Sequence, residues 1–310
     1  MKAMKVNLFS IGAMRAASTS IYHYLGQHPE IYMSPVKEPD YFIAEYCRRR
    51  LASGKALSKR QHESIERILN SGKYRTAEAY QSLFEGAEDY KYIGEASCYL
   101  HHPPTAELIH EYNPHSKIII CLRNPIDRIH SEYMLYVRDS KVDVSFSEFI
   151  SSRIIWNKDK NVWEPQSANR LNKGFYSKQI APWLYCFGKE NVKIFLFEDI
   201  ARDPAHICQL LYIWLEVDSA FKPEKVHAQR SGKPISKKLM RVINNNYLIR
   251  RYAKPVLPSL LRIKIRDYFY KTFLKKEKMS VHIQDILKII YFEEINQLEK
   301  MVSIDLSKWK

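Results

Sequence analysis

Short apolar runs alternate with helical patterns along the first two thirds of the chain. The runs lie at residues 6–11, 31–33, 92–94, 117–122 and 192–197. Such short, continuously apolar runs are typical of parallel strands that are buried on both faces. Between them, apolar residues recur at helical spacing over residues 18–28, 105–112, 128–138 and 176–187. The alternation predicts an α/β fold with a central parallel sheet flanked by helices, and ligands at the carboxyl ends of the strands.

The remaining segments predict excursions from this core. Residues 46–80 are polar and charge-rich, which indicates a helical excursion over the mouth of the site. Residues 156–170 have no clear periodicity and are expected to form a loop, whereas residues 285–301 show the pattern of an amphipathic helix. The chain has neither an internal repeat nor a low-complexity linker, so we expect residues 1–310 to form a single domain.

The segment after the first apolar run has the features of a phosphate-binding loop. Gly12 ends the run, Arg15 follows, and a helix opens on Ser18, Thr19 and Ser20. Backbone N–H groups and the positive end of a helix dipole attract anions at such a strand-to-helix turn. The nucleotide-triphosphatase pattern G-x-x-x-x-G-K-[ST] is not met, because Ala17 replaces the second Gly and no Lys precedes Ser18. The loop therefore predicts a phosphate ligand without specifying which one.

A second segment points to the same chemistry. Arg123 follows the apolar run at 117–122, and Pro125 opens a helix in which Ser131 lies about two turns further on. An Arg at a strand end and a Ser on the next helix can hold one phosphate together, Arg through its fork and Ser through its hydroxyl. The alternative is a structural salt bridge at Arg123 and an ordinary helix position at Ser131.

The distribution of charge indicates which ligands the C-terminal region could bind. The net charge is +15, and residues 222–278 hold 17 basic and 3 acidic residues, so this C-terminal region carries nearly all of it. An anionic ligand, an acidic polymer or a membrane surface would suit the region, although a solvated basic face is the alternative.

Five scattered cysteines without C-x-x-C spacing make a metal site or a disulfide framework improbable. No apolar run approaches the roughly 20 residues that span a bilayer. We therefore expect a cytoplasmic protein, with peripheral membrane contact as a further expectation.

The two phosphate-binding segments resemble those of sulfotransferases that use 3′-phosphoadenosine 5′-phosphosulfate (PAPS). In that family a G-x-x-K-x-G-T-T loop cradles the 5′-phosphosulfate, and L-R-N-P-x-x-R-x-x-S-x-Y holds the 3′-phosphate. The second motif is matched at every position that it specifies, from Leu122 to Tyr133. The first is matched with Arg15 for the Lys, Ala17 for the Gly and Ser18-Thr19 for the Thr pair. The similarity continues, in order, at residues 28–29, 34–42, 94–100, 174–176, 197–199, 230–236 and 305–309.

The resemblance implies a nucleotide-kinase-like fold of the P-loop type and a set of site residues. The implied PAPS-binding residues are Arg15, Ala16, Ala17, Ser18, Thr19, Ser20, Arg123, Ser131, Arg230, Ser231, Gly232 and Lys233. Arg15 would also stabilise the leaving bisphosphate, but a guanidinium cannot donate a proton as a Lys could. Glu38 is the implied base for an acceptor hydroxyl, with Glu95 and His102 as rivals. Sulfuryl transfer does not require a metal, since a monoanionic group needs less neutralisation than a phosphoryl group.

The expected activity is transfer of a sulfuryl group from PAPS to a hydroxyl, most simply of a saccharide or glycoconjugate. Ala96 stands where heparan sulfate sulfotransferases commonly carry a Lys, which argues against a heparan-type acceptor. Two alternatives stay open at this point: a kinase-like phosphate-loop enzyme, and a non-enzymatic basic protein that binds an acidic polymer. Nucleic acid is not expected as a partner, because the matches gather in the nucleotide crevice while most of the charge lies elsewhere.

Overall fold

The computed structural model describes residues 5–157, 162–166, 170–225, 233–234, 274–275 and 279–310. The chain divides into two compact units. The sheet unit comprises residues 1–123 and 176–228, and the helical unit comprises residues 124–175 and 229–310. The chain therefore passes from the sheet unit to the helical unit directly after Arg123.

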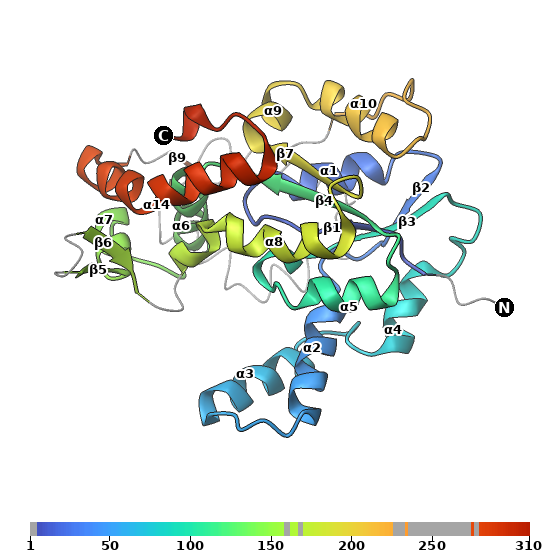
Figure 1. Ribbon diagram of the computed structural model, residues 1–310, viewed down its shortest axis with the longest axis horizontal. Helices are drawn as coiled ribbons and strands as arrows, with labels where there is room; N and C mark the ends of the chain where they lie inside the picture. The colour runs from blue at the N-terminus through green and yellow to red at the C-terminus, as the bar shows by residue number, and fades with distance from the viewer. Residues whose placement is uncertain (1–4, 158–161, 167–169, 226–232, 235–273, 276–278) are drawn as a thin grey trace. The chain divides into compact units, whose positions relative to one another are not determined.

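The sheet unit is built on five parallel strands in the order β2-β3-β1-β4-β7 (Figure 1). Their bounds are β1 Leu8–Ser10, β2 Ile31–Met33, β3 Tyr92–Ala96, β4 Lys117–Leu122 and β7 Val192–Leu196. The central strand β1 pairs Phe9 with Glu95 of β3 and with Ile118 of β4. The predicted α/β fold with a parallel sheet is confirmed.

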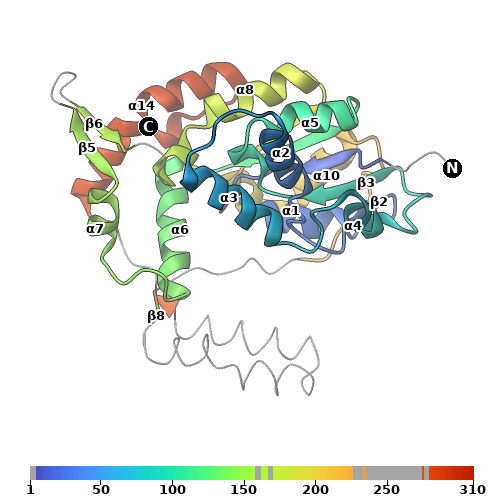
Figure 2. The same cartoon turned by 90° about the horizontal axis from the view of Figure 1, so that it is seen from below.

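Helices cover both faces of this sheet. Figure 2 shows α5 (Thr105–Tyr112) and α8 (Tyr176–Phe187) on one face, and α1 (Ser18–Leu25) on the other, where it contacts α10 (Pro204–Trp214). A short helix, α9 (Phe197–Arg202), joins β7 to α10. Leu8, Phe9 and the residues from Ile118 to Leu122 have no exposed surface or almost none. The sheet is therefore the core of this unit, as continuously apolar strands require.

The polar segment at residues 46–80 is helical, as predicted. It contains part of α2 (Tyr41–Ala52), α3 (Lys59–Asn70) and most of α4 (Ala77–Gln81), followed by the 3₁₀ turn η1 (Ser82–Phe84). Figure 1 shows α2 and α3 extending away from the sheet. Ser58 caps α3 in a capping box with Gln61, which explains why so polar a helix begins there. A second 3₁₀ turn, η2 (Tyr99–His101), follows β3.

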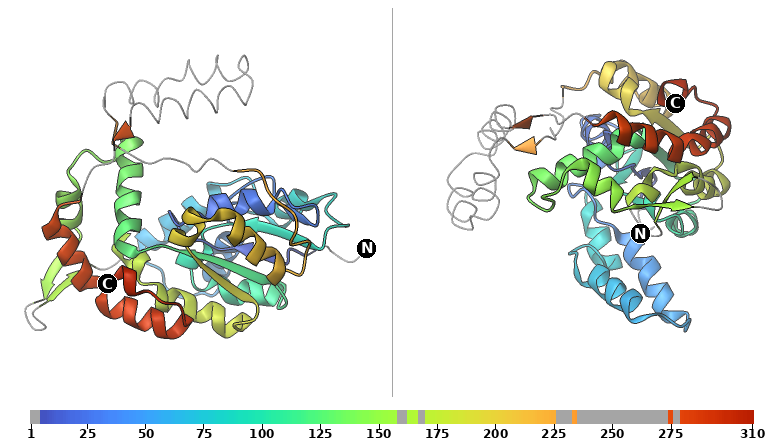
Figure 3. Two further views of the ribbon diagram at one scale, coloured as in Figure 1. Left: turned by 90° about the horizontal axis from the view of Figure 1, so that it is seen from above. Right: turned by 90° about the vertical axis from the view of Figure 1, so that its left-hand side faces the viewer.

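The helical unit is organised around two helices, α6 (Pro125–Arg138) and α14 (Val281–Val302) (Figure 3). The predicted final helix at residues 285–301 is confirmed and begins four residues earlier, after Ser280, which accepts a hydrogen bond from the Ile283 N–H. Shorter elements complete the unit: α7 (Phe146–Ser151), η3 (Arg170–Gly174), η5 (Ser307–Trp309) and the paired two-residue strands β8 (Lys233–Pro234) and β9 (Leu274–Lys275).

The prediction of a loop at residues 156–170 is wrong in part. Residues of β5 (Ile154–Asn157) and β6 (Val162–Pro165) form an antiparallel hairpin in which Trp156 opposes Trp163. The two indole rings lie 5.2 Å apart, centroid to centroid, at an angle of 67°. Each strand has only four residues, too few for the alternating pattern to be recognised, and cross-strand aromatic contact supplies the stability instead.

A buried ion pair anchors α6. Arg128, which belongs to the second phosphate motif, donates to Glu132 at 2.8 Å, and both side chains are fully buried. Arg170 donates to the other carboxylate oxygen at 2.8 Å. Burial alone would raise the pKa of Glu132, but the charges of Arg128 and Lys173 and the hydrogen bonds from Tyr136 and Arg128 outweigh it and lower the pKa to about 2. The motif's second Arg is therefore a structural residue of the helical unit.

Candidate functional site

The predicted site residues of the sheet unit gather at the carboxyl edge of the sheet. After β1 the chain turns toward β2, whereas after β4 it continues toward β7 on the other side. The strand order therefore reverses between β1 and β4, which is where ligands bind in open α/β sheets. The loop containing Arg15 follows β1, and Arg123 follows β4 directly.

The loop after β1 is held tightly by its neighbour β4. The Ala13 N–H donates to the Cys121 carbonyl, and the Cys121 N–H donates to the Gly12 carbonyl, both at 2.6 Å. Three residues then take a positive φ: Gly12 at 117°, Arg15 at 66° and Ala17 at 68°. A side chain is rarely found in this conformation, so Arg15 and Ala17 carry backbone strain, which clusters at ligand sites.

The helix that follows the loop is open to an anion. Ala17 is the N-cap of α1 and, within the described part of the chain, provides no side-chain hydrogen bond to the first turn. The opening residues of that turn are Ser18, Thr19 and Ser20, and none of the first-turn residues is acidic. An anion at this helix end would receive backbone N–H groups and the positive dipole. The geometry fits the phosphate that the sequence predicts.

Arg123 lies against this loop. Its guanidinium donates to the Arg15 carbonyl at 3.2 Å and stacks over the Phe197 ring at 4.2 Å. The hydroxyl of Tyr176 donates to the Arg123 carbonyl at 2.9 Å, which fixes the backbone at the strand end. The structure thus brings Arg123, a permanent cation, against the loop that leads into α1.

Ser131 belongs to the helical unit. It lies on α6 with only 6% of its surface exposed. Joint binding of one phosphate by Arg123 and Ser131 stays a prediction. Arg230, Ser231 and Gly232 lie outside the described residues, and Lys233 is described only by its backbone in β8. Most of the basic region at 222–278 likewise lies outside the described residues.

Glu38 lies at the same edge, on the segment that follows β2. Its N–H donates to the Ala96 carbonyl at 2.8 Å, so the segment is tied to the end of β3. The carboxylate is half exposed and forms an ion pair with Lys37 at 2.8 Å. The thiol of Cys98 lies 3.9 Å from the same oxygen. A half-exposed carboxylate at the edge of the sheet can accept a proton from a bound hydroxyl.

The two rival bases occupy different surroundings. Glu95 is fully buried and accepts hydrogen bonds from three hydroxyls: Tyr99 at 2.7 Å, Ser97 at 2.8 Å and Tyr80 at 3.1 Å. Burial raises the pKa of Glu95 to about 7 despite these hydrogen bonds. Since protein hydroxyls surround it, Glu95 organises the end of β3. His102 is exposed beyond η2, and its N–H donates to the Tyr99 carbonyl at 2.7 Å.

Sequence reasoning did not identify two residues that contact the Glu38 segment. Ser97 accepts a hydrogen bond from the Asp40 N–H at 3.2 Å. Arg75 donates to the Asp40 carbonyl at 2.7 Å and to its carboxylate at 3.2 Å. Arg75 lies in a polar segment without periodicity, so only the folded chain reveals its role.

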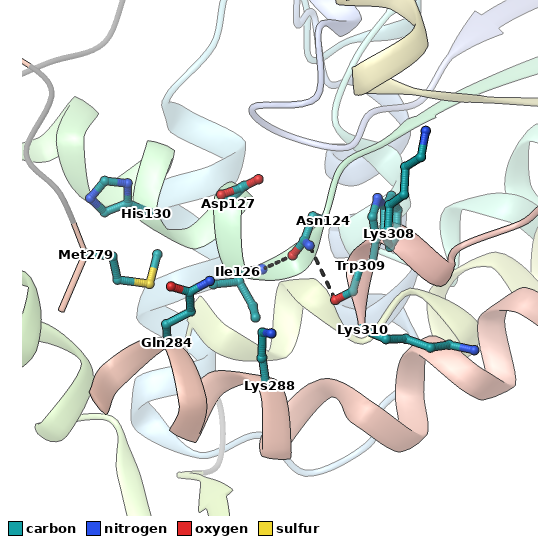
Figure 4. Close-up of a pocket in the computed structure, with 10 residues that line it drawn as sticks. All are labelled: Asn124, Ile126, Asp127, His130, Met279, Gln284, Lys288, Lys308, Trp309 and Lys310. Carbon is teal, nitrogen blue, oxygen red and sulfur yellow. Dashed lines mark hydrogen bonds between the residues drawn. The ribbon is translucent and has the colours of Figure 1, made fainter. Parts of the chain in front are cut away.

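The helical unit contains a separate cavity of about 500 Å³ (Figure 4). Asn124 caps α6 there by accepting from the Ile126 N–H at 2.9 Å, and its amide lies 3.5 Å from the Trp309 carbonyl. Ammonium groups and polar side chains line it together with three apolar residues: Asn124, Ile126, Asp127, His130, Met279, Gln284, Lys288, Lys308, Trp309 and Lys310. None of the predicted site residues is among these ten.

The described residues contain no cluster of three His, Cys, Asp or Glu side chains that could hold a metal ion. They also contain no helix with the length and apolar character needed to cross a membrane.

Comparison with known proteins gives consistent results. A model of the sulfotransferase family matches residues 7–222. Carbohydrate sulfotransferase 15 of Mus musculus is 24% identical over 270 residues, which cover 74% of this chain and 46% of the mouse protein. Membrane-associated sulfotransferase kil1 of Dictyostelium discoideum is 30% identical over 128 residues, which cover 41% of this chain and 22% of that protein. The crystal structure of a sulfotransferase from Alicyclobacillus acidocaldarius superimposes with a TM-score of 0.63 at 26% identity, and the match covers 99% of both chains. The chain spans about half the length of the carbohydrate sulfotransferases that it matches.

Proposed function

The chain belongs to the sulfotransferase family, and from that premise we propose that it transfers a sulfuryl group from PAPS to a hydroxyl of a saccharide or glycoconjugate. One observation carries the donor assignment. The Arg123 guanidinium, at the end of β4, lies 3.2 Å from the carbonyl of Arg15 in the loop after β1. This contact brings one permanent cation against the loop that leads into α1, which supports binding of a nucleotide with phosphates at both its 3′ and 5′ positions.

The residues of the chain have distinct roles in the proposed reaction. Residues 15–20 would hold the 5′-phosphosulfate through backbone N–H groups and hydroxyls, and Arg123 would hold the 3′-phosphate together with Ser131. Glu38 would take the proton of the acceptor hydroxyl as its oxygen attacks sulfur in line. The new O–S bond forms while the bond from sulfur to the 5′-phosphate oxygen breaks. 3′,5′-Adenosine bisphosphate then leaves with the electron pair, and Arg15 stabilises its growing negative charge.

The saccharide acceptor is the least constrained part of the proposal. It is supported by the relatives named as carbohydrate sulfotransferases. Ala96 follows Glu95 at the end of β3, where it offers no cation to an acidic polymer such as heparan sulfate. We therefore propose that the acceptor is a hydroxyl of a neutral or weakly acidic sugar. Cytoplasmic location, and contact of residues 222–278 with an acidic glycan or a membrane surface, stay predictions.

Ligand-induced thermal stabilisation tests the donor class. A ligand that binds only the folded chain stabilises it by RT ln(1 + [L]/Kd), so the melting temperature rises with ligand concentration. We expect 3′,5′-adenosine bisphosphate to do so without magnesium, and ATP with or without magnesium to have little effect. Equal stabilisation by ATP would instead favour a kinase-like enzyme, and no stabilisation by either nucleotide would contradict the proposal. Incubation with ³⁵S-labelled PAPS and a panel of sugars then tests the acceptor.

A further inference from the structure

The segment that carries Glu38 is held in an unusual conformation by residues outside it. We propose that Arg75 and Ser97 are positioning residues, which hold Asp40 and thereby fix the Glu38 carboxylate in the place where it accepts the proton. The inference rests on the proposed function and on the role of Glu38 in it.

The backbone of this segment would not keep its conformation unaided. Glu38 has a φ of 59° and Asp40 a φ of 53°, and neither is glycine. Pro39 lies between them and disfavours helical conformations in the residue that it follows. Strained backbone of this kind persists only where the surrounding structure enforces it. Contacts with residues outside the segment therefore hold Glu38 and Asp40 in this conformation.

Arg75 supplies the first of these contacts. One guanidinium nitrogen donates to the Asp40 carbonyl at 2.7 Å and another lies 3.2 Å from the Asp40 carboxylate. The Arg75 side chain is only 13% exposed, so water competes weakly for this fork. Gly72 leaves room for it, because a Cβ at position 72 would lie 2.4 Å from Arg75 Nε. Since Arg75 follows α3, the polar excursion is joined directly to the segment of the candidate base.

Ser97 supplies the second contact, to the N–H of the same residue. Its hydroxyl accepts the Asp40 N–H at 3.2 Å and donates to buried Glu95 at 2.8 Å. Glu95 is held in turn by Tyr80 and Tyr99. The N–H and the C=O of Asp40 are thus both bound by fixed groups. This leaves the backbone two residues after Glu38 little freedom to relax.

Charge gives Arg75 a second role. Burial raises the pKa of Asp40, the Arg75 guanidinium lowers it, and the like charge of Glu38 raises it. Without Arg75, the like charge of Glu38 on Asp40 would still be opposed by Lys37 but no longer by the guanidinium. Repulsion between the two carboxylates would add to the tendency of the segment to relax away from its present conformation.

The effect of Arg75 should appear in turnover and not in donor binding. For Arg75→Met we expect kcat to fall about 10- to 100-fold, since a displacement of about 1 Å can cost a factor of that size. The Kd for 3′,5′-adenosine bisphosphate should stay within about twofold. Arg75→Lys should recover part of the loss through its charge on Asp40. Arg49→Met is the matched control, because Arg49 is half exposed and pairs with Glu45 and Glu111 instead of Asp40.

A double-mutant cycle separates positioning from general destabilisation. If Arg75 acts through Glu38, then Arg75→Met should lower the residual rate of Glu38→Gln by less than about twofold. Gly72→Ala, which pushes on the guanidinium without removing it, should reproduce part of the kcat loss in the wild-type background and none in Glu38→Gln. Additive losses in the double mutant, or an unchanged kcat in folded Arg75→Met, would overturn the positioning role alone. Full turnover in Glu38→Gln would overturn the role of Glu38 and this inference together, whereas absent donor binding in the wild type would overturn the proposed function itself.

Discussion

At the residue scale, two glutamates near the same sheet edge differ in what surrounds them. Glu38 is half exposed beside Lys37, whereas Glu95 is fully buried under three hydroxyls. The sequence left both open as bases, since each follows or ends a strand. Burial favours Glu38 as the base, because a buried carboxyl that accepts hydrogen bonds from protein hydroxyls supports the structure, whereas an exposed one can reach a substrate.

Glu38→Gln tests this assignment directly. The amide keeps the size of the side chain but cannot take a proton, and general-base catalysis is worth about 10²- to 10⁴-fold. We expect kcat to fall by at least about 100-fold while the Kd for 3′,5′-adenosine bisphosphate is unchanged in a calorimetric titration. Glu66→Gln, which changes an exposed carboxylate on α3, serves as the control. Retained turnover would transfer the role of base to His102 or Glu95.

Arg123→Ala tests the nucleotide site. Loss of a charged hydrogen bond costs about 1.5–3 kcal/mol, which corresponds to roughly 10- to 100-fold in affinity. We expect the Kd for 3′,5′-adenosine bisphosphate to rise by that factor, measured by isothermal titration. The exposed Arg202, which pairs with Asp199, provides a matched control in Arg202→Ala. Equal affinities of the two variants would remove Arg123 from the site.

At the element scale, the predicted bounds of a helix or strand agree with the structure where its hydrophobic pattern is continuous. The predicted ranges of β4, α5 and α8 coincide with the structure because buried strands and amphipathic helices give long, uninterrupted signals. The β5–β6 hairpin was missed because its strands are short and partly exposed. The strand at 192–197 ends one residue early, since Phe197 already begins α9.

Gly94 lies where β3 closely approaches both of its neighbouring strands. A Cβ there would lie 2.6 Å from Met33 Sδ in β2 and 3.1 Å from the Leu8 carbonyl in β1. Gly94→Ala should therefore lower the free energy of unfolding by about 1–3 kcal/mol, as overpacking does. The comparison is Gly26→Ala, whose Cβ would lie 3.4 Å or more from its neighbours. Urea titrations in which both variants lose the same amount would show that the close approach at Gly94 is tolerated.

At the scale of the whole molecule, two buried carboxyls shape how stability depends on pH. The pKa of Glu95 is raised to about 7 by burial, whereas the pKa of Glu132 is lowered to about 2 because the opposing charges of Arg128 and Lys173 outweigh burial. Glu95 holds its proton more tightly in the folded chain, so its contribution is complete below pH 4.5 and is lost as pH rises to about 7. Glu132 acts in the opposite sense: its contribution is present above pH 4.5 and is lost as pH falls toward 2.

Removing either carboxyl should change a different part of the pH profile. In the wild type, titration of Glu95 should lower the unfolding free energy by up to about 3 kcal/mol between pH 4.5 and 7. Glu95→Gln should abolish this decrease. Glu132→Gln should instead flatten the loss of unfolding free energy below pH 4.5, although loss of the buried ion pair with Arg128 will lower stability overall. Urea denaturation at pH steps from 3 to 8 measures both profiles. A Glu95→Gln profile parallel to that of the wild type would show that this carboxyl does not titrate with folding.

The sequence by itself determined the α/β fold and the parallel strands, and it predicts the phosphate chemistry of residues 12–20 and 123. These are local properties, because apolar periodicity and strand-to-helix turns are written in consecutive residues. Only the tertiary structure decided that Glu95 is buried, that Arg128 pairs with Glu132, and that Arg75 and Ser97 hold Asp40. The contacts to Asp40 join residues far apart in the chain. The burial of Glu95 and of the Arg128–Glu132 pair, which sets their roles, exists only once the chain has folded.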